Sequence, residues 1–298
     1  MNLMLNAYDV IRANPTARRF QIGEILFSQF TCPAQEEPIS IWSQTDHLVH
    51  VVSAHATWKT SSGTWSVEAG ETVFFRKGVF VLPPHFEENV CILIFFIPDA
   101  FVRETVRELV SQLRPVSQLP AAPDPVMRVK NDTGLSAFFQ SMLVYFAEDE
   151  DPPEALLKLK LKELLTSVLV SPANPALSTY FRSLAICEAP SLPAIMEANF
   201  SHRLPLHAFA KMCHRSLSSF KREFRRCYGT TPAKWLLGRR LECAAQMLRT
   251  TNMSMTEIAL ECGFEEPSHF SRTFKAKFGH SPTEYREQET PAELTAST

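Results

Sequence analysis

The sequence contains no hydrophobic run long enough to cross a membrane as a helix. Its longest continuous apolar stretch is VCILIFFI, at residues 90–97, whereas a membrane helix needs roughly 18 to 20 apolar residues. The start of the chain also lacks a basic segment followed by an apolar segment and a small-residue cleavage site, the features of an export signal. We therefore expect a cytoplasmic protein with no membrane partner, in which VCILIFFI is a buried strand.

Paired cysteines are also missing. The seven cysteines are widely scattered, and none of them belongs to a CxxC pair. This spacing argues against a disulfide framework and against a zinc knuckle. We interpret the cysteines as buried free thiols, which behave as small hydrophobic side chains.

The formal net charge of −2 hides an uneven distribution along the chain. Residues 201–286 include 15 Lys and Arg against 7 Asp and Glu, a net charge of +8, whereas residues 1–200 include 15 against 22, a net charge of −7. Residues 287–298 add −3. Clustered Lys and Arg are typical of nucleic-acid-binding proteins, although a solvated charged face can have the same composition. The chain therefore combines an acidic N-terminal part with a basic C-terminal part.

At 298 residues the chain is long enough for two domains, and its first part has the pattern of β structure. Four stretches rich in β-branched and aromatic residues are punctuated by Gly, Pro and Asn: QIGEILFSQF, HLVHVVSAHATWK, TWSVEAGETVFFRKGVFVL and NVCILIFFIP. This spacing predicts a β-sandwich or small barrel over residues 1–98. Together with the helical segments that follow, it predicts an α+β protein.

Helical periodicity begins at residue 99. Apolar residues at 99–113, among them Val102, Val106 and Val110, fall on one helical face. A proline-rich connector at 115–125 follows, and residues 135–146 and 177–187 have the pattern of further helices. We assign 99–187 to a helical dimerisation segment, and the breaker EAPSLP at 188–193 to the domain boundary.

The segment 153–170 has an ambiguous pattern. Its LKLKLK stretch alternates as a strand would, yet five apolar residues form a helical stripe along the whole segment: Leu157, Leu161, Leu164, Leu165 and Val168. We interpret the segment as a helix. We expect these apolar residues to contact a partner subunit in a homodimer.

A sequence repeat occupies the basic C-terminal part. The segments SFKREFRRCYGTTPAKW and HFSRTFKAKFGHSPTEY share five positions, each 50 residues apart, as 270 − 220 illustrates. The matching residues are Phe220, Phe224, Gly229, Pro232 and Trp235 in the first copy and Phe270, Phe274, Gly279, Pro282 and Tyr285 in the second. A repeat in register indicates one structural unit used twice.

Each copy predicts a helix-turn-helix unit. In the second copy, residues 255–261 form a short helix, a turn contains Gly263 and Phe264, and residues 267–278 form a second helix. Gly263 can adopt the left-handed conformation that ends a helix, and Phe264 can fill the angle between the two helices. Phenylalanines recur every four residues in the second helix and must face the core.

The first copy is expected to form helices at 206–212 and 217–226. Its turn, Cys213-His214-Arg215, lacks glycine and is one residue shorter. Residues 233–249 form one amphipathic helix between the copies, with packing residues at Trp235, Leu236, Leu241, Ala245 and Leu248.

These features resemble the DNA-binding domain of the AraC/XylS family of bacterial transcription regulators, in which a long helix joins two helix-turn-helix units. The resemblance covers residues 192–288, and 289–298 are expected to be a disordered tail. The matching residues are Ala210, Phe220, Phe224, Gly229, Pro232, Arg240, Leu241, Ala244, Ile258, Ala259, Gly263, Phe264, Phe270, Arg272, Phe274, Phe278, Gly279, Pro282 and Tyr285. The resemblance implies a DNA-binding transcriptional activator, with RNA polymerase as a further partner.

The stretches CHRSLSSFKREF, GETVFFRKGVFVL and FFIPDAF resemble the ExsA-like subgroup of that family. This similarity implies a role in activating virulence or type III secretion genes. It also implies an N-terminal domain that mediates self-association and receives a regulatory protein, while a small-molecule effector is the other possibility.

The outward faces of the two recognition helices supply the candidate DNA-binding residues. Side chains near the start of such a helix meet base edges in the major groove, and we assign this role to Ser218, Lys221, Arg222, Ser268, His269 and Arg272. Arg225 and Lys275 are expected to hold phosphates. Leu217 and Pro267 can touch thymine methyl groups, although capping or packing explains them equally well.

Two alternatives belong to other functional classes. The β part resembles a cupin barrel, a fold that often carries a metal, and its candidate ligands are His47, His50, His55 and His85. Since His47 and His50 are an odd number apart, they point to opposite faces of a strand, and no pair of carboxylates stands nearby. We therefore expect no metal, no cofactor and no enzymatic activity. The other alternative is an interaction protein without specific DNA binding, which a steep salt dependence of binding would exclude.

Overall fold

The computed structural model describes residues 4–32, 38–60, 63–83, 90–113, 124–186 and 192–289. Its contacts divide the chain into two compact units, Met1–Ala194 and Ile195–Thr298. The boundary expected at 188–193 falls largely outside the described residues. So do most of the connector at 115–125 and, apart from Glu289, the tail expected at 289–298.

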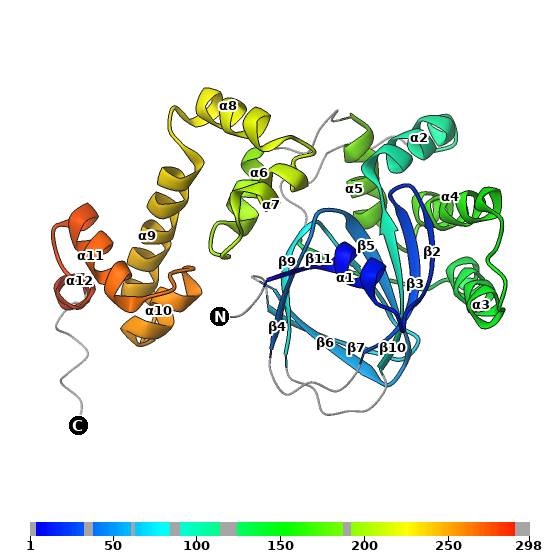
Figure 1. Cartoon of the computed structure of the whole chain (residues 1–298), viewed down its shortest axis with the longest axis horizontal. Coiled ribbons are helices and arrows are strands. Elements are labelled where there is room, and N and C mark those ends of the chain that lie inside the picture. The colour runs from blue at the N-terminus through cyan, green and yellow to red at the C-terminus, as the bar shows by residue number, and fades with distance from the viewer. Residues whose placement is uncertain are drawn as a thin grey trace. The chain divides into compact units, whose positions relative to one another are not determined.

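Two β-sheets form the framework of the first unit (Figure 1). One has the strand order β1-β4-β9-β6-β7 and the other the order β11-β8-β5-β10-β3-β2. Pairing is antiparallel except between β1 and β4. The strands are β1 (Leu5–Asn6), β2 (Arg18–Ile22), β3 (Ile25–Cys32), β4 (Ile39–Ser43), β5 (Asp46–Ser53), β6 (His55–Thr60), β7 (Gly63–Glu68), β8 (Thr72–Phe75), β9 (Gly78–Leu82), β10 (Val90–Ile97) and β11 (Val126–Val129).

The six-stranded sheet is buried on both faces, which explains its continuous apolar sequences. Successive side chains of a strand point to opposite faces. Phe74 and Phe95 therefore pack against helices, whereas Phe75 and Phe96 pack between the two sheets. The buried strand expected at 90–97 is confirmed as β10, which pairs with both β3 and β5.

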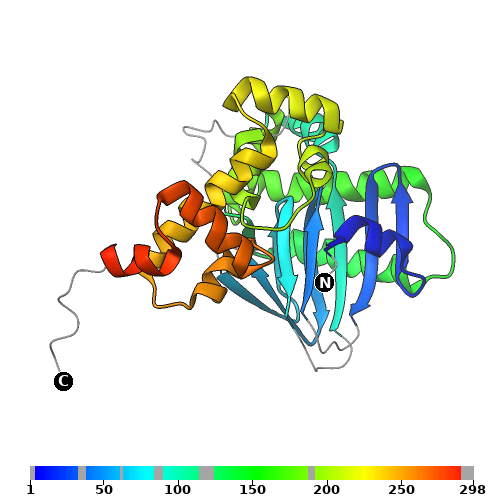
Figure 2. The same ribbon diagram turned by 60° about the vertical axis from the view of Figure 1, so that its left-hand side comes forward.

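Helices cover the outer face of the six-stranded sheet (Figure 1, Figure 2). They are α2 (Asp99–Leu109), α3 (Thr133–Ala147), α4 (Glu154–Val170) and α5 (Pro175–Ile186). The helical interpretation of 153–170 is confirmed. Because α2 ends at Leu109, Val110 leaves the expected buried face and is 68% exposed.

The apolar stripe on α4 has a different role from the one expected. Leu157, Leu161, Leu164 and Val168 are buried in the same core as the six-stranded sheet. The stripe therefore packs within the unit and cannot serve as a face for a partner. The large apolar residues of α4 that are exposed are Leu159 and Val170.

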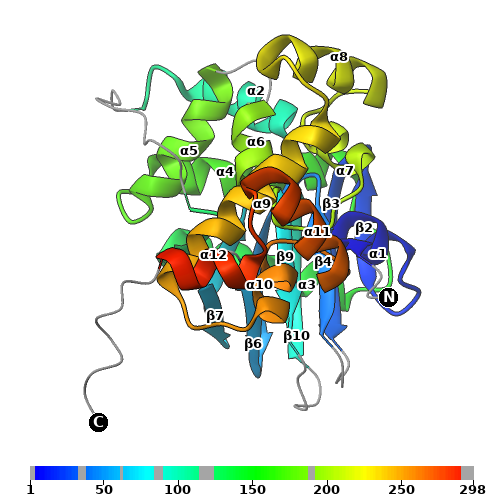
Figure 3. The same ribbon diagram turned by 90° about the vertical axis from the view of Figure 1, so that its left-hand side faces the viewer.

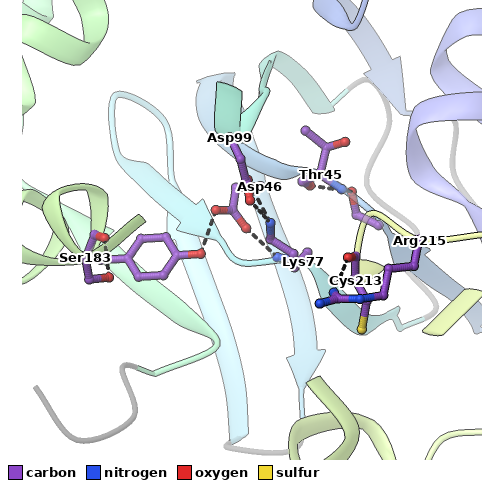
Figure 4. A network of polar contacts seen from close by, with 9 residues as sticks. Thr45, Asp46, Lys77, Asp99, Ser183, Cys213 and Arg215 are labelled. Carbon is purple, nitrogen blue, oxygen red and sulfur yellow. Dashed lines mark hydrogen bonds and ion pairs between the residues drawn. The ribbon is translucent and has the colours of Figure 1, made fainter. Parts of the chain in front are cut away.

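A buried polar network connects this sheet to two of its helices (Figure 4). The Lys77 ammonium donates to both carboxylate oxygens of Asp99 at 2.7 Å, and the Lys77 amide donates to Asp46 Oδ1 at 2.7 Å. The Tyr180 hydroxyl donates to Asp46 Oδ2 at 2.7 Å. These partners compensate the cost of burying the charges and fix α2 and α5 on the sheet.

Helices alone form the second unit (Figure 1, Figure 3). They are α6 (Leu192–Asn199, which begins in the first unit), α7 (Leu206–Met212), α8 (Leu217–Tyr228), α9 (Pro232–Thr250), α10 (Met255–Glu261), α11 (Pro267–Phe278) and α12 (Pro282–Glu289). The ribbon shows α8 and α11 near opposite ends of α9. No helix within the described ranges is long and apolar enough to span a bilayer.

Candidate nucleic-acid interface

Both predicted helix-turn-helix units are present, and their turns share one hydrogen-bonding pattern. In the first, the Arg215 amide donates to the Ala210 carbonyl at 2.9 Å. In the second, the Phe264 amide donates to the Ala259 carbonyl, also at 2.9 Å. The two turns therefore have the same backbone geometry although only one contains glycine.

The left-handed position of each turn is occupied by a different residue. Gly263 has a φ of 84° and His214 a φ of 53°. A Cβ at residue 263 would lie 2.3 Å from the Ser201 carbonyl oxygen, so the second turn needs glycine for space as well as for its conformation. The first turn can accept a histidine at the cost of a less favourable backbone.

The residue after the left-handed position also differs. Phe264 is 3% exposed and packs with Phe270, at 5.1 Å between ring centroids, as expected from the sequence. At the corresponding place in the first turn, Arg215 is half-buried and forms an ion pair with Glu223 of α8. The angle between the two helices is thus filled by an ion pair in the first helix-turn-helix unit and by an aromatic ring in the second.

Aromatic side chains pack the recognition helix α8 against α9 and the recognition helix α11 against α12. Phe220, Phe224, Phe270 and Phe274 are fully buried, as their four-residue spacing predicts. The Trp235 ring lies 5.9 Å from Phe224, and the Tyr285 ring lies 5.3 Å from Phe274. These contacts reproduce the sequence repeat in space, since the residues occupy matching positions of the two copies.

All ten candidate DNA-binding residues are exposed. On α8 they are Leu217, Ser218, Lys221, Arg222 and Arg225, and on α11 they are Pro267, Ser268, His269, Arg272 and Lys275. Among the described residues, no ion pair involves any basic member of this set. The opposite faces of both helices are buried, so the exposed polar side chains gather on one side of each recognition helix.

The starts of the two recognition helices are built differently. Ser216 caps α8 and accepts from the Ser219 amide at 3.3 Å. α11 has Pro267 in its first turn and no side-chain cap, which favours a structural contribution from this proline. Leu217 is 38% exposed and is therefore only partly packed.

The structure adds one cationic residue that the sequence interpretation omitted. Arg226 lies in the last turn of α8 and is exposed beside Arg225. Lys277, in the last turn of α11, is different because its ammonium donates to the Gly238 carbonyl at 2.9 Å and to Glu242 at 3.0 Å. The adjacent arginines at 225 and 226 indicated Arg226 in the sequence. The hydrogen-bond partners of Lys277 could be identified only from the folded structure.

An acidic face lies beside the second recognition helix. Glu257, Glu261 and Glu265 are exposed on α10 and in the following turn, together with Leu260, which is 49% exposed. Negative side chains are unfavourable next to phosphates, so this face differs in its possible partners from the basic faces of α8 and α11.

Two histidines of strand β5, His47 and His50, have structural roles. His47 stacks on Phe75 between the sheets, while His50 stacks on Phe139 at 4.0 Å, so the two point to opposite faces as predicted. Burial lowers the pKa of each to about 4, which keeps both neutral. His55 is half-buried, and His85 lies outside the described residues.

The described residues include no candidate metal site, and five of their cysteines are free thiols. They contain no group of three or more His, Cys, Asp and Glu residues placed to hold a metal ion. Cys213 and Cys262 are buried free thiols as expected, but Cys91 and Cys243 are half-buried and Cys227 is exposed.

Two protein-family models match the chain. The model described as the ExsA N-terminal regulatory domain matches residues 46–180. The model described as a helix-turn-helix domain matches residues 209–288, which include both recognition helices.

The chain is similar to several transcription regulators. It is 27% identical to the virulence regulon transcriptional activator VirF of Yersinia enterocolitica over 241 residues, which cover 81% of this chain and 89% of that protein. It is 28% identical to the HTH-type transcriptional regulator ExsA of Pseudomonas aeruginosa over 239 residues, which cover 80% and 84%. Among solved structures, a point variant of ToxT from Vibrio cholerae is 14% identical with a TM-score of 0.44, covering 90% of this chain and 99% of that chain.

Proposed function

Because the chain is an AraC-type DNA-binding transcriptional activator, related to VirF and ExsA and not an enzyme, we propose that it recognises two adjacent major-groove segments, one with α8 and one with α11. The observation that carries this proposal is the pair of exposed basic helix faces near opposite ends of α9. DNA is the partner that such faces fit, because phosphates attract their cations and the major groove admits a helix.

The length of α9 supports binding to one side of the duplex. Its 19 residues extend over roughly 28 Å at 1.5 Å per residue. Successive major-groove faces lie about 34 Å apart. With the flanking turns added, one chain can span the two segments. The two helices carry different side chains, so the site is asymmetric.

The exposed residues divide by their position on each helix. Ser218, Lys221 and Arg222 on α8 contact base edges, as do Ser268, His269 and Arg272 on α11. Arg225, Arg226 and Lys275, nearer the helix ends, contact phosphates and fix the orientation of the protein without specifying sequence. Leu217, which is exposed, adds an apolar contact to a thymine methyl group, whereas Pro267 contributes to the start of α11.

An insertion experiment tests the two-groove proposal. A duplex selected from a random pool by the full chain is lengthened by about five base pairs between its half-sites, which turns one half-site to the far side of the helix. We expect affinity to fall to that of one half-site, and an insertion of about ten base pairs, one full turn, serves as the control for rotation. Equal binding to the native and five-pair duplexes would exclude the proposal.

The first unit carries regulation and self-association. The space between its sheets holds large side chains, among them Trp58, Phe75 and Phe80, which favours a regulatory protein on the surface over a small molecule inside. The homodimer forms through the exposed face of α4, where Leu159 is 62% and Val170 54% exposed. If a fragment starting at residue 192 responds to every condition that changes the activity of the full chain, regulation does not reside in the first unit.

The acidic face of α10 is the contact for RNA polymerase. It lies in the DNA-binding unit yet repels phosphates, and it surrounds the exposed Leu260 with Glu257 and Glu261. Glu261→Lys should therefore reduce transcription in a purified system without weakening DNA binding, since the new positive charge attracts phosphates. Full transcription by this variant would remove α10 from the polymerase contact.

The target genes are virulence genes, including those for type III secretion. The similarity to the Yersinia virulence regulon activator supports this assignment, as does the match to the ExsA N-terminal domain. A transcriptional activator acts where the chromosome is, which places it in the cytoplasm. A genome-wide map of bound sites with no enrichment at such genes would contradict the assignment.

A further inference from the structure

The loop between α6 and α7, which precedes the first helix-turn-helix unit, contacts both α9 and the turn of the second helix-turn-helix unit. The guanidinium of Arg240, on α9, donates to the Phe200 carbonyl at 2.7 Å and to the His202 carbonyl at 2.8 Å. Arg203 of the same loop donates to the Phe264 carbonyl in the second turn. The close approach of the Ser201 carbonyl to Gly263 completes the contact. The loop at 200–203 is therefore fixed between α9 and the second turn.

A second connection starts from the adjacent residue of α9. Arg239 donates to Glu197 of α6 at 2.8 Å and to Glu242 of α9 at 2.8 Å. Glu242 also accepts from Lys277 of α11 at 3.0 Å. A continuous series of ion pairs thus leads from α6, across α9, to the second recognition helix.

We propose that Arg239, Arg240 and Glu242 are positioning residues, which fix the separation and angle of the two recognition helices without contacting DNA. We call this set, with Glu197, Lys277 and the loop at 200–203, the inter-repeat brace. The inference rests on the proposed two-groove recognition, since spacing matters only if both helices bind one duplex.

We expect these ion pairs to affect the relative positions of the helices more than the stability of the fold. The Arg239 and Glu242 side chains are 35% and 50% exposed, and ion pairs at such exposure contribute little to the free energy of unfolding. Their effect on geometry is larger. Two linked binding modules gain affinity from each other only when the linker places both on their sites together.

The brace also explains why Lys277 of α11 is not among the residues that we assign to phosphate contacts. Lys277 is the α11 lysine whose ammonium is held by Glu242 and the Gly238 carbonyl. Residue 227, at the corresponding position of α8, is a cysteine. The brace therefore joins α11 to α9, while α8 is seated on α9 by Trp235 and Tyr228, at 5.2 Å between ring centroids.

Glu242→Gln in the full chain tests the inference, with Glu287→Gln on α12 as a control for the loss of one exposed negative charge. The probes are the selected duplex, the same duplex with the spacer changed by one or two base pairs, and each half-site alone. For Glu242→Gln we expect about fivefold weaker binding to the selected duplex and a flatter dependence on spacing, because fewer molecules hold both helices in register. Half-site binding and melting temperature should match those of the control.

The outcomes separate this inference from the proposed function. A wild-type spacing profile in Glu242→Gln would overturn the brace, as would an equal loss on half-sites and on the selected duplex. Arg240→Lys keeps the charge but loses the forked geometry, and it should flatten the same profile if it melts as the wild type does. Absence of any spacing preference in the wild type would instead overturn two-groove recognition.

Discussion

Single residues determine the two turns of the DNA-binding unit. Gly263 and His214 occupy the same left-handed position, yet the Ser201 carbonyl approaches only Gly263 closely enough to exclude a side chain. The sequence predicted the left-handed role of Gly263 from its place after a helix. It could not predict the approach of Ser201, which is 62 residues away (263 − 201).

Replacing this glycine should destabilise the second unit. Gly263→Ala places a methyl group against a backbone oxygen in a left-handed conformation, and we expect a loss of at least about 2 kcal/mol in the free energy of unfolding. Urea unfolding measures it. His214→Gly is the matched control, because it relieves the left-handed backbone of the first turn and should change stability by no more than about 1 kcal/mol. Equal stability of Gly263→Ala and the wild type would contradict the packing described.

At the scale of elements, helices with local signals were the most predictable. The expected ranges 206–212, 255–261 and 267–278 coincide with α7, α10 and α11. Proline or serine precedes or opens these helices, and a left-handed residue follows each one. The short elements α1 (Ala7–Ala13), β4 and β11 were not predicted, because their stability comes from tertiary contacts and not from their few residues.

The same reasoning explains the mistaken role of the α4 stripe. Leu161 and Leu164 have the periodicity of a buried helix face, and the sequence alone does not say whether a sheet or a second subunit covers that face. The structure places the face in the core of the first unit. For α8 and α11, the four-residue spacing of the phenylalanines predicted which face is buried, and the residues proposed to contact DNA lie on the exposed face that remains.

Strand β5 should make the first unit sensitive to acid. The folded-state pKa values of His47 and His50 are lowered by burial to about 4, so below pH 6.5 the unfolded chain binds protons that the folded chain does not. Stability is therefore fully present above about pH 6.5 and falls as the pH decreases toward 4. Between pH 7 and pH 5 we expect a loss of roughly 2 kcal/mol for each histidine.

Urea unfolding of His47→Phe provides the comparison, since the new ring can pack between Phe75 and Phe80. This variant should lose less stability between pH 7 and pH 5 than the wild type. An unchanged pH dependence would show that His47 does not titrate as described.

At the scale of the whole molecule, we propose that self-association takes place through the first unit, and a charge on its α4 face tests the proposal. Leu159→Lys places a charge on the exposed face of α4 and should convert the dimer to a monomer in sedimentation velocity experiments. Val110→Lys, at a residue 68% exposed at the end of α2, is the control and should remain dimeric. A Leu159→Lys dimer would require a different interface.

The central claim is that one chain uses two non-equivalent recognition helices on one duplex, and the base preferences of Arg222→Ala and Arg272→Ala test it most directly. Each full-length variant selects binding sites from a random pool at fixed salt. Arg222→Ala should relax preference in one half-site and Arg272→Ala in the other, about ten base pairs away, each at a cost of roughly 1 to 3 kcal/mol if the arginine contacts guanine in two places. Relaxation of the same base pairs by both variants, or of none, would contradict the claim.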